Sequence, residues 1–271
     1  MRNCFILCGI KLTLLGAFVM TAPAEGQQPG APPTESRALG PADLEAIAAP
    51  YRQPEGFRQL CEAVKTRSIE VADRHKQFAH TETTTSIEID GKGQPTKKEE
   101  VVERVRFGGD QEYRTVVRKV DLLNRVDQTP AKPREVIPPK ATLIYPFTRE
   151  APDNAYRFSF EGCQLVDGQP RLVIRFEPNG PPDEKFRGVL LIDPQTLEPL
   201  VFDAQWAKPP KFVNQMTMRL EWGPANNGHT QTLRSLVTGS GGFAFVQRSY
   251  RIETRVGDYR QPASQAQASV N

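Results

Sequence analysis

The sequence predicts a mainly β protein (α+β), in which one N-terminal helix precedes a long, curved antiparallel meander. Three observations support this fold class. Residues 54–78 carry apolar side chains at helical spacing behind a proline. Alternating polar and apolar runs of strand length begin at His80 and become continuous from Tyr156. Asp-Gly pairs at Asp90 and Asp167 separate neighbouring runs, which indicates hairpins.

The first 24 residues have the pattern of a secretory signal peptide. Arg2 and Lys11 supply a basic start, residues 12–20 (LTLLGAFVM) an apolar core, and the A-P-A triplet at 22–24 a cleavage site. The apolar core is shorter than the ~20 residues that a membrane-spanning helix needs. We therefore expect a cleaved signal, and no integral membrane span in the mature chain.

The alternative of a lipid-anchored chain needs a cysteine directly after the apolar core. Cys4 and Cys8 both precede that core, so they are in the wrong place for lipid attachment. We expect an exported protein, periplasmic or, in a cell without an outer membrane, secreted.

Two segments have the composition of tails rather than of a folded core. Residues 25–53 hold five prolines among Gly, Ser, Gln and Ala, and residues 262–271 are similar in composition. We predict a disordered Pro-rich linker over 25–53, in which PADLEAIAA (41–49) is compatible with a short helical turn. We also predict a single β-rich domain over 54–261 and a disordered tail over 262–271.

The elements of this domain are predicted in order. Pro54 and Glu55 suit a helix start, and we expect the helix to end near Phe78. The runs around Asp90 form a first hairpin, and a third strand is expected at 112–120. Residues 121–153 contain six prolines and predict a long crossing loop, a kind of segment that often covers a functional site.

From Tyr156 onward, about seven further strands follow in meander order. Their alternation, with Ile174 and Phe176 against Arg175 and Glu177, predicts a sheet with one face buried and the other in water. Most aromatic residues lie in this half and should line the concave face of the curved sheet. Two interpretations remain open, a core filled by these side chains or a ligand cavity between the helix and the sheet.

Motifs for catalysis, cofactors or metals are missing from the sequence. G-S-G-G at 239–242 is not a nucleophile elbow, and D-G-K-G at 90–93 lacks the spacing of a phosphate loop. The three histidines, His75, His80 and His229, are scattered, and we expect them on the surface. We therefore assign no catalytic residue, no metal ligand and no cofactor, and predict that the chain is not an enzyme.

Charged residues favour no anionic partner. Lys and Arg number 35 against 32 Asp and Glu, a net charge of +3, so phosphate-driven nucleic-acid binding is not expected. The run Glu99, Glu100 and Glu103 is flanked by Lys and Arg, and we interpret it as an ion-paired outer face of a strand.

Cys61 and Cys163 are the two cysteines that remain after signal cleavage. An even count in an exported chain predicts a disulfide between them. Two buried free thiols are the alternative.

Three segments carry a resemblance to a known family. They are DRHKQFAHTETTTSIEIDGKGQ (73–94), YRFSFEGCQLVDGQPRLVIRFEPNGPPDEKFRGVLLIDPQTLEPLVFDAQW (156–206) and VGDYR (256–260). The chain resembles the LolA/LolB-like outer-membrane lipoprotein-sorting superfamily, its periplasmic members more than its true carriers. The resemblance implies an incomplete, half-open β-barrel covered by helix and loop, with a cavity for acyl chains. It assigns no individual ligand-binding residue.

Three functional hypotheses follow. The first is an exported protein that binds an apolar ligand, a lipid or a lipoprotein acyl chain, in the half-barrel cavity. The second is a non-enzymatic cell-envelope scaffold that binds envelope proteins through its loops or sheet edge. The third, a hydrolase with a non-standard site, has no motif behind it.

Overall fold

The computed structural model describes residues 39–138, 146–149, 151–152, 154–181, 185–243 and 246–261. The predicted signal peptide, the first part of the predicted linker (25–38) and the predicted tail lie outside the described residues. The elements in chain order are α1 (Pro41–Ala48), the 3-10 helix η1 (Ala49–Tyr51), α2 (Pro54–His75), β1 (Ala79–Asp90), β2 (Pro95–Gly108), β3 (Gln111–Asp121), β4 (Val126–Asp127), β5 (Glu135–Val136), β6 (Tyr156–Val166), β7 (Gln169–Pro178), β8 (Phe186–Ile192), β9 (Pro199–Trp206), β10 (Val213–Pro224), β11 (Thr230–Phe243) and β12 (Val246–Arg260).

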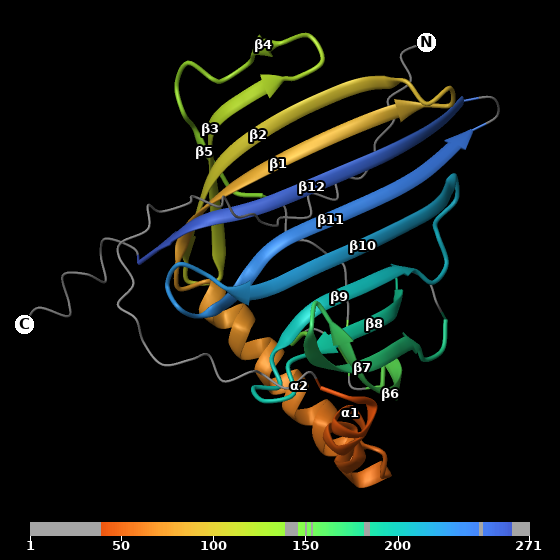
Figure 1. The fold of residues 1–271 in the computed structure, drawn as a ribbon. Helices are drawn as coiled ribbons and strands as arrows, with labels where there is room; N and C mark the ends of the chain where they lie inside the picture. Colours follow the sequence, from red (N-terminus) through yellow and green to blue (C-terminus); the bar gives the residue numbers. More distant parts are fainter. Residues whose placement is uncertain are drawn as a thin grey trace, which may run out of the picture.

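All twelve strands join one antiparallel sheet in the order β4-β3-β2-β1-β12-β11-β10-β9-β8-β7-β6, with β5 pairing β3 (Figure 1). The sheet is curved and not closed, and the predicted fold class is confirmed. Neighbours in the sheet are mostly neighbours in sequence. Apart from β5 on β3, the exception is β1 against β12, which joins the first three strands to the C-terminal meander.

Both predicted hairpins form, and their turns explain why. The Asp90 carboxylate accepts hydrogen bonds from the backbone N–H groups of Lys92 and Gln94, each at 2.9 Å. Asp167 and Gly168 connect β6 to β7 with φ angles of 51° and 74°. Two consecutive positive φ angles are typical of the tight hairpin turn that Asp-Gly favours.

The predicted linker is partly folded, which corrects the boundary at residue 54. Pro41 begins α1, and the Gly40 N–H donates to the Asp43 carboxylate at 2.7 Å. Ala48 is buried, and Tyr51 meets Phe160 of β6 edge-on at 5.8 Å between ring centroids. These apolar contacts make α1 and η1 part of the domain, whose first described helix begins at Pro41.

The long helix α2 begins at Pro54 as predicted and ends at His75, three residues before the expected end. Leu60, Val64 and Val71 are its buried residues, spaced so that they share one stripe. This stripe packs on β9 and β11, on the face of the sheet that we call the inner face.

The inner face holds the main core. Phe176, Phe186 and Phe202 are fully buried, and the rings of Phe176 and Phe202 stack at 5.1 Å between centroids. Strand alternation places the inner residues of neighbouring strands in register, as Leu220 of β10 lies opposite Phe202 of β9. Most of the described aromatic residues of this half pack in or against the core, whereas Phe212 is 50% exposed.

The outer face carries charged residues that pair across strands. Arg219 contacts Asp203 of β9 at 3.0 Å and Glu221 at 2.7 Å. Arg234 of β11 contacts Glu221 at 3.7 Å and Glu253 of β12 at 3.1 Å. The ion pairs run across four strands, which marks this face as the solvated one.

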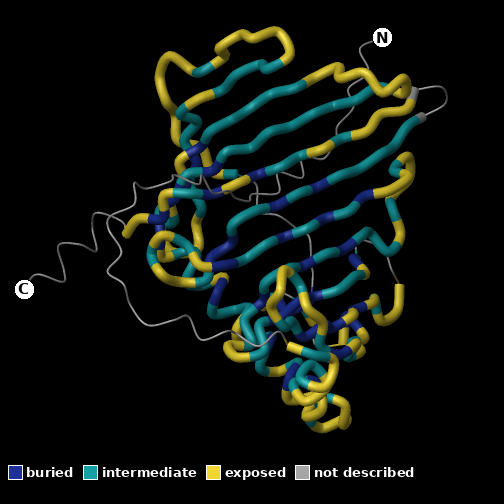
Figure 2. Tube along the Cα trace, in the orientation of Figure 1, coloured by how far each residue is buried: buried dark blue, intermediate teal, exposed yellow. Residues whose placement is uncertain are grey.

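Burial is uneven along the sheet. Figure 2 shows buried residues in β6–β11 near the helices and also at one end of β1, β2, β3 and β12. In β1, by contrast, no residue from Thr83 to Asp90 is buried. We call the strands packed against the helices the covered half of the sheet, and the remaining part, which includes Thr83–Asp90 of β1, the uncovered half. The two halves differ in how far their residues are buried.

Candidate functional site

A cavity of about 350 Å³ lies between the C-terminal half of α2 and the inner face of the sheet. Its sheet wall is formed by Leu190, Phe202, Leu220 and Trp222, and its helix wall includes Ala72. Leu190, Phe202 and Leu220 lie opposite one another on three neighbouring strands, so the alternation of each strand builds this wall. The volume is at the lower end of the ~300–1,000 Å³ typical of ligand sites.

Residues 146–149 of the predicted crossing loop cover part of the cavity. Phe147 is buried and packs against Phe158 of β6 at 4.7 Å between ring centroids. The Arg149 guanidinium pairs with the Asp73 carboxylate of α2 at 2.7 Å. The loop is thus attached at one point to the sheet and at another to the helix.

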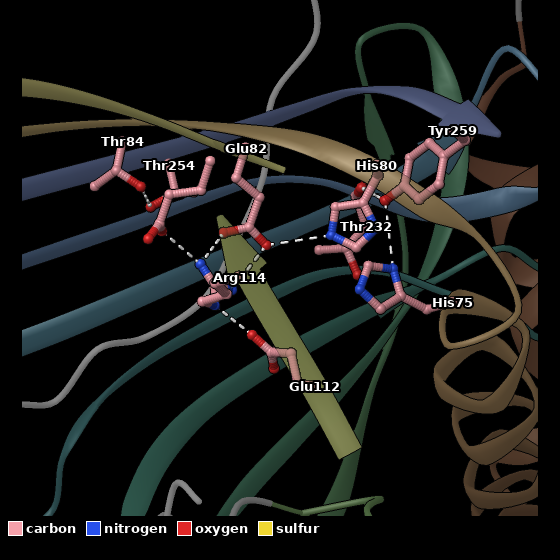
Figure 3. A network of polar contacts seen from close by, with 10 residues as sticks. His75, His80, Glu82, Thr84, Glu112, Arg114, Thr232, Thr254 and Tyr259 are labelled. Carbon is pink, nitrogen blue, oxygen red and sulfur yellow. Dashed lines mark hydrogen bonds and ion pairs between the residues drawn. The ribbon is translucent and has the colours of Figure 1, made fainter. Parts of the chain in front are cut away.

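The polar end of the cavity is built around Arg114 of β3, whose side chain is 5% exposed (Figure 3). Its Nη1 donates to Glu82 Oε2 at 2.7 Å and to Glu103 Oε2 at 2.8 Å, while its Nη2 donates to Glu82 Oε1 at 3.1 Å. Its Nε donates to the Glu112 carboxylate. Glu112 also lines the cavity. One guanidinium therefore holds three carboxylates.

Strand pairing brings these residues together. Glu82 of β1 lies opposite Glu103 of β2, and Arg114 of β3 lies opposite Val105 of β2. Like charges directly opposite each other repel across a sheet. The guanidinium offsets the repulsion between Glu82 and Glu103 by bonding to both.

Two histidines lie beside this cluster. The rings of His75 and His80 are 4.6 Å apart between centroids, and His80 Nε2 is 3.3 Å from Glu82 Oε1. The Tyr259 hydroxyl donates to the Thr232 carbonyl at 2.8 Å, which leaves its oxygen to accept from His75 Nδ1 at 3.4 Å. Tyr259 therefore fixes the orientation of a histidine that lines the cavity.

Burial sets the charge states in this region. Desolvation, followed by the neighbouring His80, lowers the pKa of His75 to about 3. Desolvation likewise lowers the pKa of His80 to about 4. Both imidazoles are therefore neutral at pH 7. Burial raises the pKa of Glu82, and the Arg114 guanidinium opposes that change.

The sequence-based placement of these residues was wrong in part. His80 is 3% exposed rather than on the surface, and His75 faces the cavity, while His229 is exposed as expected. Glu100 pairs with Arg118 on the exposed side of β2 as expected, whereas Glu103 is buried against Arg114. Strand alternation could have predicted this difference, because Glu100 and Glu103 are an odd number of residues apart on β2 and so lie on opposite faces of the sheet.

Cys61 and Cys163 are both free thiols here and both pack against the main core. Burial raises the pKa of the Cys61 thiol to about 12, and burial also raises that of Cys163. Neither is an activated nucleophile. The disulfide between them stays a prediction for the oxidised protein.

Within the described ranges, no set of three or more His, Cys, Asp or Glu side chains is placed to hold a metal ion. The helices described by the structure include none with the length and apolar content to cross a membrane.

No family model and no curated protein matches this chain. Among solved structures, it is similar to a LolA superfamily protein from Nitrosomonas europaea, at 7% identity and a TM-score of 0.36, over 76% of this chain and 93% of that one. It is also similar to a domain from Vibrio parahaemolyticus described as an outer-membrane lipoprotein-sorting protein, at 11% identity and a TM-score of 0.37, over 73% and 94% of the two chains.

A third similar structure is the MucA/MucB complex of Pseudomonas aeruginosa, at 12% identity and a TM-score of 0.23, over 78% of this chain and 96% of that one. The first two structures bear the family names that the sequence resemblance predicted. All three TM-scores are below 0.5.

Proposed function

We propose that this chain is an exported, non-enzymatic binding protein that holds an apolar ligand, a lipid or a lipoprotein acyl chain, between α2 and the sheet. The observation that carries the proposal is the cavity of about 350 Å³ with Phe202, Leu220 and Trp222 in its wall. At roughly 30 Å³ for a group the size of a water molecule, it accommodates about a dozen methylene groups.

The energetics favour such a ligand. Each buried methylene contributes about 0.8 kcal/mol to the free energy of binding. The loss of translational and conformational freedom of the ligand offsets part of this gain. The sheet wall lies on paired strands and stacked rings, so little ordering is needed when an acyl chain enters. The polar end leaves room for a head group beside His75 and Glu112.

The test is native mass spectrometry of residues 25–271, purified from a bacterial periplasm without detergent. We expect adduct masses of lipids or acyl chains that disappear after organic extraction. Ala72 is exposed and lines the cavity, so the Ala72→Phe variant fills it without disturbing the core. This variant should lose the adducts and should bind a hydrophobic dye at least about tenfold more weakly, a difference of ~1.4 kcal/mol.

The matched control is Ala46→Phe, which adds the same ring at an exposed position of α1. It should keep both the adducts and the dye. A bare mass for the wild-type chain, together with equal dye binding by all three proteins, would contradict the proposal.

A second function, a scaffold that binds an envelope protein by strand addition, is favoured by one observation. Strand β6 ends the sheet and carries Leu165 at 44% exposure, whereas the opposite edge strand, β3, is partly covered by β4 and β5. An uncovered edge strand is a template for another chain. A Leu165→Lys variant should lose a partner that the wild type recovers from envelope extracts, and recovery of the same partner by both proteins would contradict this function.

A further inference from the structure

The apolar cavity has an acidic end. Glu112 lines the cavity with its side chain 23% exposed, and behind it lie Glu82 and Glu103. Arg114 is the only cation bonded to these three carboxylates among the described residues. Its guanidinium makes four hydrogen bonds to them, so the cluster has one positive charge for three acids.

From this arrangement we propose that the cavity selects amphiphiles whose head is cationic or donates hydrogen bonds, such as an amine or an amide, over the same chain ending in a carboxylate. The inference rests on the proposed function and deepens it by naming the class of ligand. Ligand and protein charges at this depth interact strongly, because the surrounding walls are apolar.

The excess of negative charge does not depend on every carboxylate being ionised. Burial raises the pKa of Glu82, and protonation of that one group still leaves two carboxylates against one guanidinium. The histidines add no compensating charge, since burial lowers the pKa of both His75 and His80 far below neutrality. The cluster therefore keeps a net negative charge at pH 7.

Two other cations line the cavity, and each is already paired with an aspartate. Lys76 Nζ lies 2.8 Å from Asp110 Oδ1, and Arg149 lies 2.7 Å from Asp73. All four of these side chains are at least one-third exposed, so solvent and salt screen them. They provide no buried anion site to oppose the acidic end.

Neutral His75 suits the same head groups. Its Nδ1–H is directed to the Tyr259 hydroxyl, which leaves Nε2 as an acceptor. A carboxylate oxygen of Glu112 is a second acceptor on the cavity wall. A head with N–H groups can donate to both acceptors, whereas a carboxylate head, which can only accept, finds no donor in this pair.

The experiment measures displacement of a bound hydrophobic dye by dodecylamine, dodecanol and dodecanoate at pH 7.5, each below its micelle concentration. At this pH the amine is protonated and the acid ionised. We expect dodecylamine to bind at least about tenfold more tightly than dodecanoate, with dodecanol between them. The Glu112→Gln variant should reduce that ratio at least about threefold, chiefly by weakening the amine.

The matched control is Glu100→Gln, which removes a carboxylate that also pairs with one arginine, on the opposite face of β2. It should leave the ratio unchanged, and urea unfolding should show both variants folded. Equal affinities for the three compounds, or tighter dodecanoate, would overturn this inference and leave the proposed function standing. Failure of all three compounds and of the dye to bind would contradict the proposed function itself.

Discussion

The part of the sheet under α2 and the part formed by β1 and β2 belong to one hydrogen-bonded antiparallel sheet, yet their buried inner positions hold different residues. Under α2, the inner positions of β8, β9 and β10 are Leu190, Phe202 and Leu220, which form core and cavity wall. On β1 and β2, equivalent positions hold Glu82 and Glu103, held by one arginine.

The difference teaches that residue type at alternate positions, rather than sheet topology, decides what an open curved sheet can bind. Apolar inner residues make the helix pack and leave an apolar cavity beside it. Charged inner residues need partners and give that cavity its polar end. The cavity lies where the two halves meet, since Trp222 and Glu112 both line it.

The largest expected effect comes from the covered half. Phe202→Ala removes a fully buried ring that stacks on Phe176, and should destabilise the fold by about 3–5 kcal/mol. Ile87→Ala on β1, a partly buried position of the uncovered half, should cost about 1 kcal/mol. Urea unfolding of both variants measures the contrast, and equal costs would break the distinction between the halves.

The second effect tests the buried cluster. Arg114→Leu leaves three carboxylates without their cation and should destabilise the fold by about 3–5 kcal/mol. Arg118→Leu, which removes an exposed arginine from the same strand, should cost less than ~1 kcal/mol. If the two substitutions lower the free energy of unfolding in urea by the same amount, the carboxylates around Arg114 do not form a buried ionic cluster.

The third effect is a pH dependence. The pKa of His80 lies at about 4 in the folded protein against 6.5 for the free side chain. Between these values the unfolded chain binds a proton that the folded chain does not, so stability falls as pH drops through this window. The slope is about 1.4 kcal/mol per pH unit for one such histidine.

Glu82 contributes with the opposite sign, because burial raises its pKa and its stabilising effect is lost as pH rises. The histidine is therefore isolated by comparing wild type with His80→Gln in urea at pH 7 and pH 5. The wild type should lose about 2 kcal/mol more than the variant over this interval. Parallel losses would show that His80 is not buried in neutral form.

The smallest effect is on the outer face. Arg219 is 41% exposed and pairs with Asp203 and Glu221. Arg219→Gln should change the free energy of unfolding by less than ~1 kcal/mol, and less still in 0.5 M salt, because exposed ion pairs are screened. A loss comparable to that of Arg114→Leu would place a buried ionic network on this face as well.

Local features of the sequence predicted much of the fold. Pro54 and the spacing behind it predicted α2, and the turns at Asp90 and Asp167 predicted two hairpins. The pairing of β1 with β12 involves residues more than 150 positions apart, and no local pattern encodes it. Helix α1 was missed as part of the domain because its flanking prolines match a linker, while its burial depends on the distant β6.

The candidate site was predictable in its apolar part only. The aromatic residues of the meander indicated a concave apolar face, and Phe202 and Trp222 lie there. The polar end was not foreseen, because Glu82 stands among threonines and Glu103 beside Arg104, so both look solvated in sequence. Their burial follows from tertiary contacts with Arg114, which is on the neighbouring strand for Glu103 and two strands away for Glu82.

The most direct test of the central claim uses the two tryptophans of the chain. Trp222 lines the cavity, whereas Trp206 stacks on Phe186 in the core. A dodecyl amine with bromine at its chain end should quench the fluorescence of Trp206→Phe, which keeps Trp222. It should leave Trp222→Phe, which keeps Trp206, nearly unquenched. Equal quenching of both variants, or of neither, would contradict a ligand site between α2 and the sheet.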